Sequence, residues 1–315
     1  MTDGSLVQGG SSLGSSALGR SALGRRIWDG TTGPVLVLVF FLMIIWYAGS
    51  VYLNSTMLID RYQKNNPDWT ATELVQDAWS MDRPILPAPH QIAVELKKTI
   101  WDKKITSKRS LVYHAGVTMS SAMLGFALGT LLGIILAVGI VHVSTLERSL
   151  MPWVIASQTI PILAIAPMII VVLGAIGITG LFPKAVISTY LCFFPVTVGM
   201  VKGLRAPNRM LLDLMRSYHA SRSEVFWKLR LPASIPYLFS SLKIAVALSL
   251  VGAIVAELPT GAQAGLGSRL LSGSYYGQTS LIWAALITAS VISATLVALV
   301  GRIEKVTVKH MGLQS

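Results

Sequence analysis

The sequence RAPNRMLLDLMRSYHASRSEVFWKLRLPASI, residues 205–235, is a polar and basic interruption between long apolar runs. Its acidic residues are Asp213 and Glu224, and its basic residues are Arg205, Arg209, Arg216, Arg222, Lys228 and Arg230. Leucine, methionine and arginine all favour helix. Because basic loops between membrane spans stay in the cytoplasm, this segment predicts a cytoplasmic helical loop that offers a docking surface to a soluble partner.

The overall composition indicates an integral membrane protein. The chain has 315 residues, of which 53% are hydrophobic and 13% are charged, whereas soluble domains carry about 25% charged residues. The net charge of +12 is spread over short segments, with no basic face interleaved with aromatic residues. Anionic lipid headgroups therefore explain the charge better than nucleic acid does. The single Cys192 lies in an apolar run, which excludes a disulfide framework.

Six apolar runs are long enough to approach the roughly 30 Å of a bilayer core. They are residues 35–53, 117–141, 153–178, 186–201, 236–256 and 281–300. A cleaved signal peptide is the alternative for the first run, but its length and the long preceding tail favour an uncleaved anchor. We predict an all-α membrane protein with about six transmembrane helices and both termini in the cytoplasm.

The runs divide the chain into three parts. Residues 1–33 are rich in glycine and serine and predict a disordered cytoplasmic tail. Residues 34–112 hold the first transmembrane helix and an extracytoplasmic segment, and residues 113–310 form the transmembrane core. The extracytoplasmic segment contains several lysines, although the positive-inside rule places most basic residues in cytoplasmic loops. The rule weakens for loops of roughly 60 residues, and this segment is close to that length.

Glycines in the second run suggest a close helix contact. Gly125, Gly129 and Gly133 recur at four-residue intervals, which places them on one helix stripe where a second helix can approach. The alternative is that glycine is simply frequent in membrane helices.

Motifs along the chain resemble those of a known family. Asp213 lies eighteen residues before Leu231-Pro232, and this resembles the EAA loop of bacterial ABC importer permeases, in which an acidic residue, small residues and a glycine precede Leu-Pro. Other stretches agree in order: LPAP (86–89), LGFALGTLLGIILA (124–137), QTIPILAIAPMIIVVLG (158–174), FFP (193–195), LKIA (242–245) and AELPTGAQAGLG (256–267). The chain is most similar to the nitrate/sulfonate/taurine-type branch, which implies a type I ABC importer permease fold.

The resemblance implies a coupling loop that lies in a groove of a cytoplasmic ATPase subunit. Its residues would be Asp213, Met215, Arg216, His219, Ala220, Ser221, Arg222, Leu231 and Pro232. Two departures stand out. Leu214 and Met215 are bulkier than the usual alanines, and His219 occupies the usual glycine position, where a left-handed backbone is often needed.

The chain lacks the motifs of an enzyme. No GxxxxGK[ST], HExxH or CxxC sequence and no GxSxG nucleophile elbow is present, and the five histidines have no metal-ligand spacing. We therefore expect no catalytic residue, no metal site and no cofactor in this chain. ATP hydrolysis is expected in a partner subunit.

Two groups of residues are candidates for the solute pathway. Pro161 and Pro167 can kink the third run, and Phe193 and Phe194 could plug the space beside the bend; an ordinary packed bundle is the alternative. The second group lies at the end of the fifth run and comprises Glu257, Gly265 and Gly267. They are expected to line the outer part of the pathway, unless Glu257 is a helix-end carboxylate that faces water.

The prediction is a permease subunit of an ATP-driven ABC importer in the bacterial inner membrane. Its expected partners are a cytoplasmic ABC ATPase, an extracytoplasmic solute-binding protein, a second permease copy and the lipid bilayer. The residues 257–279 look most similar to permeases for pyrimidine-type solutes, such as thiamine precursors or riboflavin, while nitrate, sulfonates and taurine stay open. The alternatives are a stand-alone ion-coupled secondary transporter, which would need acids near the membrane midplane, and a membrane scaffold that transports nothing.

Overall fold

The computed structural model describes residues 32–65, 68–259 and 264–312. Every regular element in these ranges is a helix. The chain forms two compact units, residues 1–81 and 82–315. The predicted tail, residues 1–33, lies outside the described residues except for its last two, which begin helix α2.

The first unit pairs one long helix with one short helix. Helix α2 spans Thr32–Asn65 and is about 51 Å long at 1.5 Å per residue, more than the bilayer core requires. Helix α3, Ala71–Ser80, begins at a capping box between Thr70 and Glu73. It packs along α2, where the Asn54 side chain donates to the Ala78 carbonyl at 3.3 Å.

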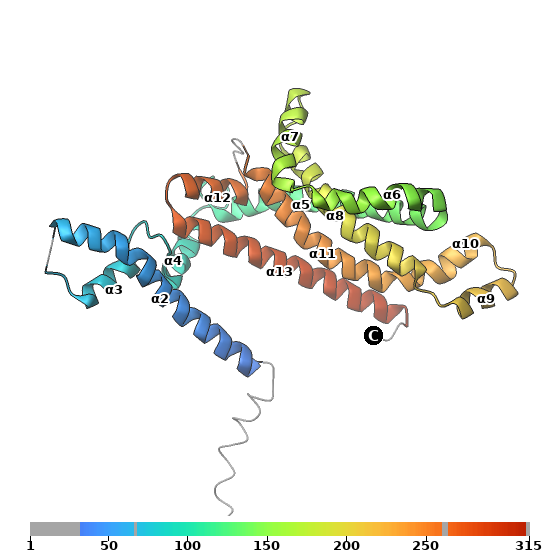
Figure 1. Cartoon of the computed structure of the whole chain (residues 1–315), viewed down its shortest axis with the longest axis horizontal. Helices are drawn as coiled ribbons and strands as arrows, with labels where there is room; N and C mark the ends of the chain where they lie inside the picture. The colour runs from blue at the N-terminus through green and yellow to red at the C-terminus, as the bar shows by residue number, and fades with distance from the viewer. Residues whose placement is uncertain (1–31, 66–67, 260–263, 313–315) are drawn as a thin grey trace, which may run out of the picture. The chain divides into compact units, whose positions relative to one another are not determined.

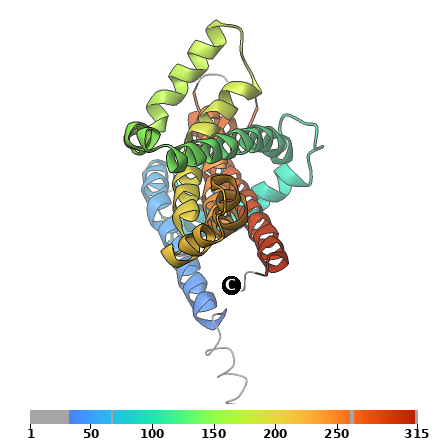
Figure 2. The same ribbon diagram turned by 90° about the vertical axis from the view of Figure 1, so that its right-hand side faces the viewer.

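The second unit is a bundle in which α5, α8 and α11 form the centre and α13 lies beside α11 (Figures 1 and 2). Its helices are α4 (Pro89–Ile100), α5 (Leu111–His142), α6 (Ser144–Ala156), η1 (Ser157–Thr159), α7 (Ile162–Ala175), α8 (Leu181–Arg205), α9 (Arg209–Ser217), α10 (Arg222–Val225), η2 (Phe226–Arg230), α11 (Leu231–Glu257), α12 (Leu266–Tyr275) and α13 (Thr279–His310).

The prediction of about six membrane spans is confirmed, but the third predicted span is bent. In the described residues five helices are long and apolar enough to cross a membrane, and a sixth span results if the bent pair Ser144–Thr159 and Ile162–Ala175 is counted as one. The two halves of that pair meet at 100°. The break falls at Ile160 and Pro161, whereas Pro167 lies inside the continuous helix α7. Figures 1 and 2 show α7 standing away from the central helices.

The glycine stripe of α5 is where α8 packs most closely, as its spacing predicted. A Cβ atom at Gly125 would lie 2.3 Å from the Cβ of Ser188, and one at Gly129 would lie 2.6 Å from the Cβ of Cys192. The two backbones therefore approach to a distance that no larger residue permits. The Ser188 hydroxyl also donates to the Ser249 carbonyl of α11 at 3.0 Å.

An ion pair joins the outer helix of the bundle to its centre. Lys243 of α11 pairs with Glu304 of α13, and both side chains are largely shielded from solvent. A charge in this apolar setting is tolerated because its partner is close.

We predict that Gly129→Ala destabilises the protein by about 1–3 kcal/mol, since the added methyl group overpacks the α5–α8 contact. Gly116 in the same helix is the matched control, because a Cβ there meets nothing within 4 Å. Gly116→Ala is expected to leave stability unchanged or raise it by about 0.5–1 kcal/mol. Thermal unfolding of the purified protein in detergent, followed by circular dichroism, measures both. Equal midpoints for the two variants would contradict the close packing.

Candidate functional site

The Glu257 carboxylate is the most buried charged group at one end of the bundle. Glu257 ends α11 and is 0% exposed. It accepts hydrogen bonds from the Thr118 hydroxyl of α5 at 2.8 Å and from the Gly267 amide of α12 at 2.9 Å. Lys184 of α8 lies 3.4 Å away and forms an ion pair with it. Four helices therefore meet at one carboxylate, and we call Thr118, Lys184, Glu257 and Gly267 the Glu257 cluster.

Two side chains of the Glu257 cluster, together with His114 of α5, hold the backbone that leads into α12. The Ala264 carbonyl accepts from Lys184 at 3.1 Å, the Gly265 amide donates to His114 Nδ1 at 2.9 Å, and the Leu266 amide donates to the Thr118 hydroxyl oxygen at 2.8 Å. Buried backbone groups need such partners. This stretch is therefore fixed by side chains of α5 and α8.

The contacts of His114 define its protonation state. The Gly265 amide can only donate, so His114 Nδ1 accepts and carries no proton. The remaining nitrogen, Nε2, carries the proton and donates to the Lys108 carbonyl at 2.9 Å. His114 is thus a neutral imidazole that joins the segment before α5 to the segment before α12.

Two glycines are required by this arrangement. Gly265 has φ +128° and ψ 161°, a conformation that is essentially restricted to glycine. A Cβ on Gly265 would also lie 2.1 Å from Cδ of Glu257, and one on Gly267 would lie 2.3 Å from the Ile254 carbonyl oxygen. The glycines therefore make room for the buried carboxylate.

A second cation, Arg269 of α12, lies at this end of the bundle. Its guanidinium donates to the Arg109 carbonyl at 3.5 Å. Burial lowers the pKa of Arg269, while the Glu95 carboxylate raises it. Because an arginine side chain is effectively always protonated in proteins, the group remains charged at neutral pH.

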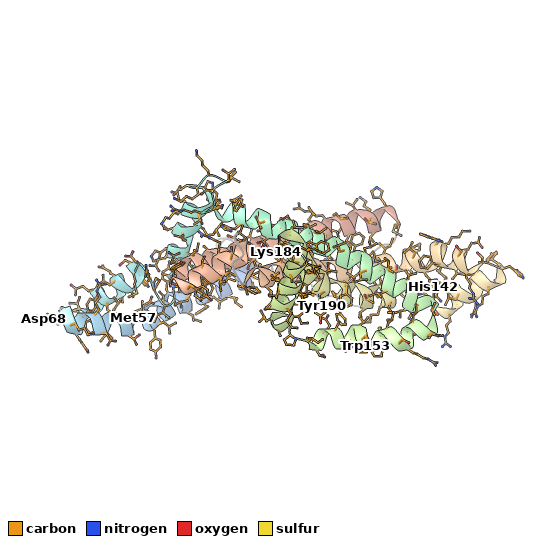
Figure 3. All side chains as sticks on the ribbon, turned by 90° about the horizontal axis from the view of Figure 1, so that it is seen from above. Met57, Asp68, His142, Trp153, Lys184 and Tyr190 are labelled. Atoms are coloured by element: carbon orange, nitrogen blue, oxygen red, sulfur yellow. The ribbon has the colours of Figure 1, made fainter. Side chains whose placement is uncertain are left out.

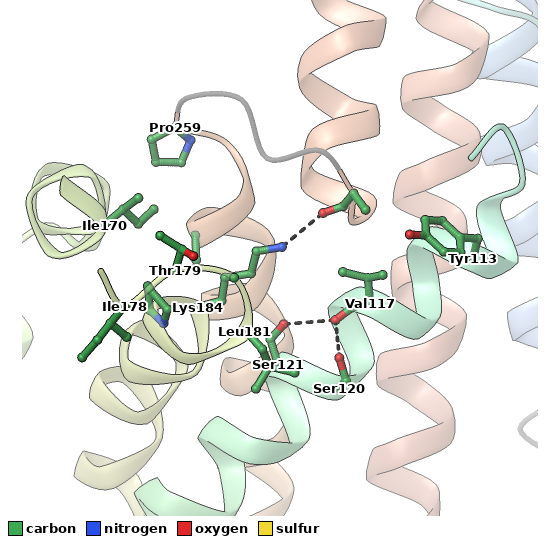
Figure 4. Close-up of a pocket in the computed structure, with 14 residues that line it drawn as sticks. Tyr113, Val117, Ser120, Ser121, Ile170, Ile178, Thr179, Leu181, Lys184 and Pro259 are labelled. Carbon is green, nitrogen blue, oxygen red and sulfur yellow. Dashed lines mark hydrogen bonds between the residues drawn. The ribbon is translucent and has the colours of Figure 1, made fainter. Parts of the chain in front are cut away.

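A cavity of about 640 Å³ adjoins the Glu257 cluster (Figure 4). It lies between α5, α7, the start of α8 and the end of α11, and its polar lining side chains are Tyr113, Ser120, Ser121, Thr179 and Lys184. Lys184 is the charged residue among the described residues that line it. Figure 3 shows Lys184 well apart from His142, which lies at the far end of α5. A cavity of this volume suits a small solute.

The structure places the Glu257 group of predicted pathway residues together beside the cavity, whereas the residues of the other group lie away from its lining. Glu257, Gly265 and Gly267 are adjacent, but Glu257 neither faces water nor lines the cavity, because Lys184 lies between. The other four predicted residues do not line this cavity: Pro161, Pro167, Phe193 and Phe194. Phe193 contacts Tyr190, whose hydroxyl donates to the Ser157 carbonyl next to the bend.

Sequence reasoning missed Lys184, Thr118 and His114. Lys184 could have been noticed, since it is a lone cation at the start of an apolar run, and ionisable groups there are seldom incidental. Thr118 and His114 gave no such signal. They lie 139 and 151 residues away from their partners Glu257 and Gly265.

At the opposite end of the bundle, the basic segment folds into helix α9, a tight turn and helix α10. His219 is the turn residue and has φ +52°. Its amide donates to the Arg216 carbonyl at 2.9 Å, and the Ala220 amide donates to the Met215 carbonyl at 3.0 Å. These are the two bonds of a Schellman motif, which usually places glycine at this position. The histidine therefore adopts the left-handed backbone that this motif usually assigns to glycine.

Helix α10 begins directly after this turn and leads into the membrane-spanning helix α11. Ser221 caps α10 through a capping box with Glu224, which also pairs with Lys228 at 2.9 Å. The chain continues through the π-helical turn η2 into α11. Leu231 and Pro232 are therefore the first residues of a long helix, and no loop ends there.

The α9–α10 segment, residues 209–225, together with Trp227, presents apolar side chains to solvent. Met210, Tyr218 and Trp227 are more than 60% exposed, and Leu214 is 51% exposed. Asp213 and Arg216 lie on the same helix and pair with each other at 3.0 Å. Exposed apolar groups rimmed by charges are typical of a protein contact.

Comparison with known proteins identifies the family. The profile of the family described as "binding-protein-dependent transport system inner membrane component" matches residues 129–312. The riboflavin permease RibX of Chloroflexus aurantiacus is 32% identical over 225 residues, 71% of this chain and 80% of RibX. The formylaminopyrimidine permease ThiX of Halalkalibacterium halodurans is 33% identical over 184 residues, 58% of this chain and 68% of ThiX. The taurine permease TauC of Escherichia coli is 26% identical over 209 residues, 66% of this chain and 74% of TauC.

A solved structure shares the fold. The crystal structure of an amino acid ABC transporter with histidines superimposes with a TM-score of 0.52 at 15% identity, and covers 62% of this chain and 92% of that one. The family profile spans more than half of the chain, and RibX is more than 30% identical over more than two thirds of it. The chain therefore belongs to the family of binding-protein-dependent transport system inner membrane components, the permeases of ABC transporters.

Proposed function

We propose that this permease docks a cytoplasmic ABC ATPase on its α9–α10 segment and forms the pathway for a small solute delivered by an extracytoplasmic binding protein. The observation that carries the proposal is the Schellman turn at His219, which holds an amphipathic helix outside the bundle. Because α10 is continuous with α11, a push on the segment acts on a membrane helix. Packed helices transmit such a push as a discrete shift.

The charge distribution supports a cytoplasmic position for the α9–α10 end, with both termini on that side of a bacterial inner membrane. The ends of α8 and α13 lie there as well and add basic residues to those of the segment. They are Lys202, Arg205, Arg302, Lys305 and Lys309. Excess lysine and arginine mark the cytoplasmic side. The Glu257 cluster then faces the compartment of the binding protein.

Helix α7 supports a pair of permeases. It leaves the bundle at the bend, and its apolar side chains are exposed, among them Leu163, Met168, Val171 and Val172. A second copy that covers this helix would bury them. Light scattering of the purified complex tests the pair: two permease chains are expected, and a single chain per particle would contradict it.

The secondary-transporter alternative is not favoured. Such carriers need ionisable groups that bind protons or ions near the membrane midplane. Glu257 and Glu304 are each paired with a lysine in this structure. Transport that persists in the absence of any ATPase would revive this alternative.

The names of the relatives point to two chemical classes of solute that this permease would transport. RibX and ThiX are named for riboflavin and formylaminopyrimidine, whereas TauC is named for taurine, which carries a sulfonate. Uptake by cells with and without this subunit, tested with each solute, separates the two classes.

Docking on the α9–α10 segment predicts that Met210→Asp or Leu214→Asp reduces copurification of the ATPase by at least about tenfold, since a buried unpaired charge costs several kcal/mol. Tyr276→Asp is the matched control. Tyr276 is equally exposed, at 68%, but follows α12 at the other end of the bundle. A tagged permease coexpressed with the ATPase gives the ratio. Loss of the ATPase in Tyr276→Asp as well would show a folding defect, whereas retention of the ATPase by Met210→Asp and Leu214→Asp would contradict docking at this surface.

The Schellman turn predicts opposite effects of two substitutions at His219. Glycine adopts φ +52° without strain, so His219→Gly should retain ATPase binding and uptake. His219→Val should lower both several-fold, because a β-branched residue is a strong outlier at positive φ. The same copurification and uptake assays measure the result. Full activity of the valine variant would mean that the turn does not orient α9.

A further inference from the structure

The cavity beside the Glu257 cluster has the features of a site that binds a small solute. It is mostly apolar, with a few polar side chains converging on it from α5 and from the loop before α8. Small-solute sites generally have this character. Its position matches the side on which the binding protein would release its solute, so a solute-recognition role for this cavity rests on the proposed function.

Lys184 faces this cavity with unused hydrogen-bonding capacity. Its ammonium group has three N–H donors. One donates to the Ala264 carbonyl at 3.1 Å and one to Glu257 at 3.4 Å. The described residues accept only these two bonds from Lys184, and its side chain is 15% exposed and lines the cavity, so the third donor can reach a solute there.

The ion pair is oriented with its positive end toward the cavity. Glu257 lies behind Lys184 and is fully buried, and the Thr118 hydroxyl and the Gly267 amide also hold its carboxylate. A solute in the cavity therefore meets the ammonium group first. Its interaction with an anion is strengthened because the surrounding walls are apolar.

We propose that Lys184 recognises an oxyanion on the transported solute, such as a sulfonate or a carboxylate. Glu257 is a positioning residue that holds the ammonium group at the cavity wall. Neutral hydroxyls of Ser120, Thr179 and Tyr113 face the rest of the solute. Of the two solute classes of the relatives, this favours an anion over a neutral heteroaromatic compound.

Two thiol reagents of opposite charge test the assignment without ATPase, binding protein or known solute. The natural Cys192 is replaced by alanine, and Ser120→Cys places one thiol in the cavity. The purified protein in nanodiscs then reacts with sulfonatoethyl methanethiosulfonate and with trimethylammonioethyl methanethiosulfonate. The ratio of the two rate constants reports the local charge, and the reaction with the cationic reagent shows that the cavity is still open in each variant.

Lys184→Met should lower the anion-to-cation rate ratio by roughly fivefold or more, as expected for the loss of a unit charge a few ångströms away. Lys184→Arg should retain the ratio, and Glu257→Gln should raise or preserve it. A Lys184→Met ratio within about twofold of the parent value, a matching fall in Glu257→Gln, or no reaction of the introduced thiol with either reagent overturns the proposal.

The outcome is independent of the ATPase. If the permease fails to bind an ATPase but the rate ratio depends on Lys184, the proposed function fails and the oxyanion site stands. If the ATPase binds but the rate ratio does not depend on Lys184, the proposed function stands and the oxyanion site fails. Uptake of taurine provides a second reading: Lys184→Met should raise the KM more than it lowers kcat, with partial recovery in Lys184→Arg.

Discussion

Burying the Glu257 carboxylate is the constraint on which this end of the molecule depends. An ionised carboxylate without partners in an apolar interior is too costly to keep, so it must be bonded on all sides. The three helices that supply its bonds, α5, α8 and α12, are thereby fixed relative to α11, which carries the carboxylate. The glycines at 265 and 267 follow from the same requirement, since any side chain there would occupy the space of the carboxylate or of the α11 backbone.

The opposite end is built on hydrogen bonds of the backbone. The Schellman turn and the capping box fix α9 and α10 without a buried charge, and their apolar side chains remain exposed. Helix α11 connects the two ends: it starts at the π turn and ends at Glu257. A continuous helix that reaches both the proposed docking surface and the proposed solute cavity is a physical means of coupling them.

Much of this architecture was accessible from the sequence. The lengths of the apolar runs predicted the membrane spans. The glycine spacing predicted a close helix contact, which α5 makes with α8, and the position of His219 predicted a left-handed turn. The bend of the third span was harder, because proline positions indicate where a helix can break but not whether it turns by 100°. The pairing of Glu257 with Lys184 and Thr118 could not be predicted. These partners lie 73 and 139 residues away in the chain, and periodicity carries no information about such pairs.

The π turn at η2 has a consequence for how the docking surface is aimed. A π turn accommodates one extra residue in a helix, and each residue of an α-helix turns the chain by about 100°. The residues before Phe226 therefore point about 100° away from the direction that an uninterrupted α-helix would give them. Thus the register of a single helical turn sets the direction in which the exposed apolar side chains of the α9–α10 segment point, independently of the orientation of α11.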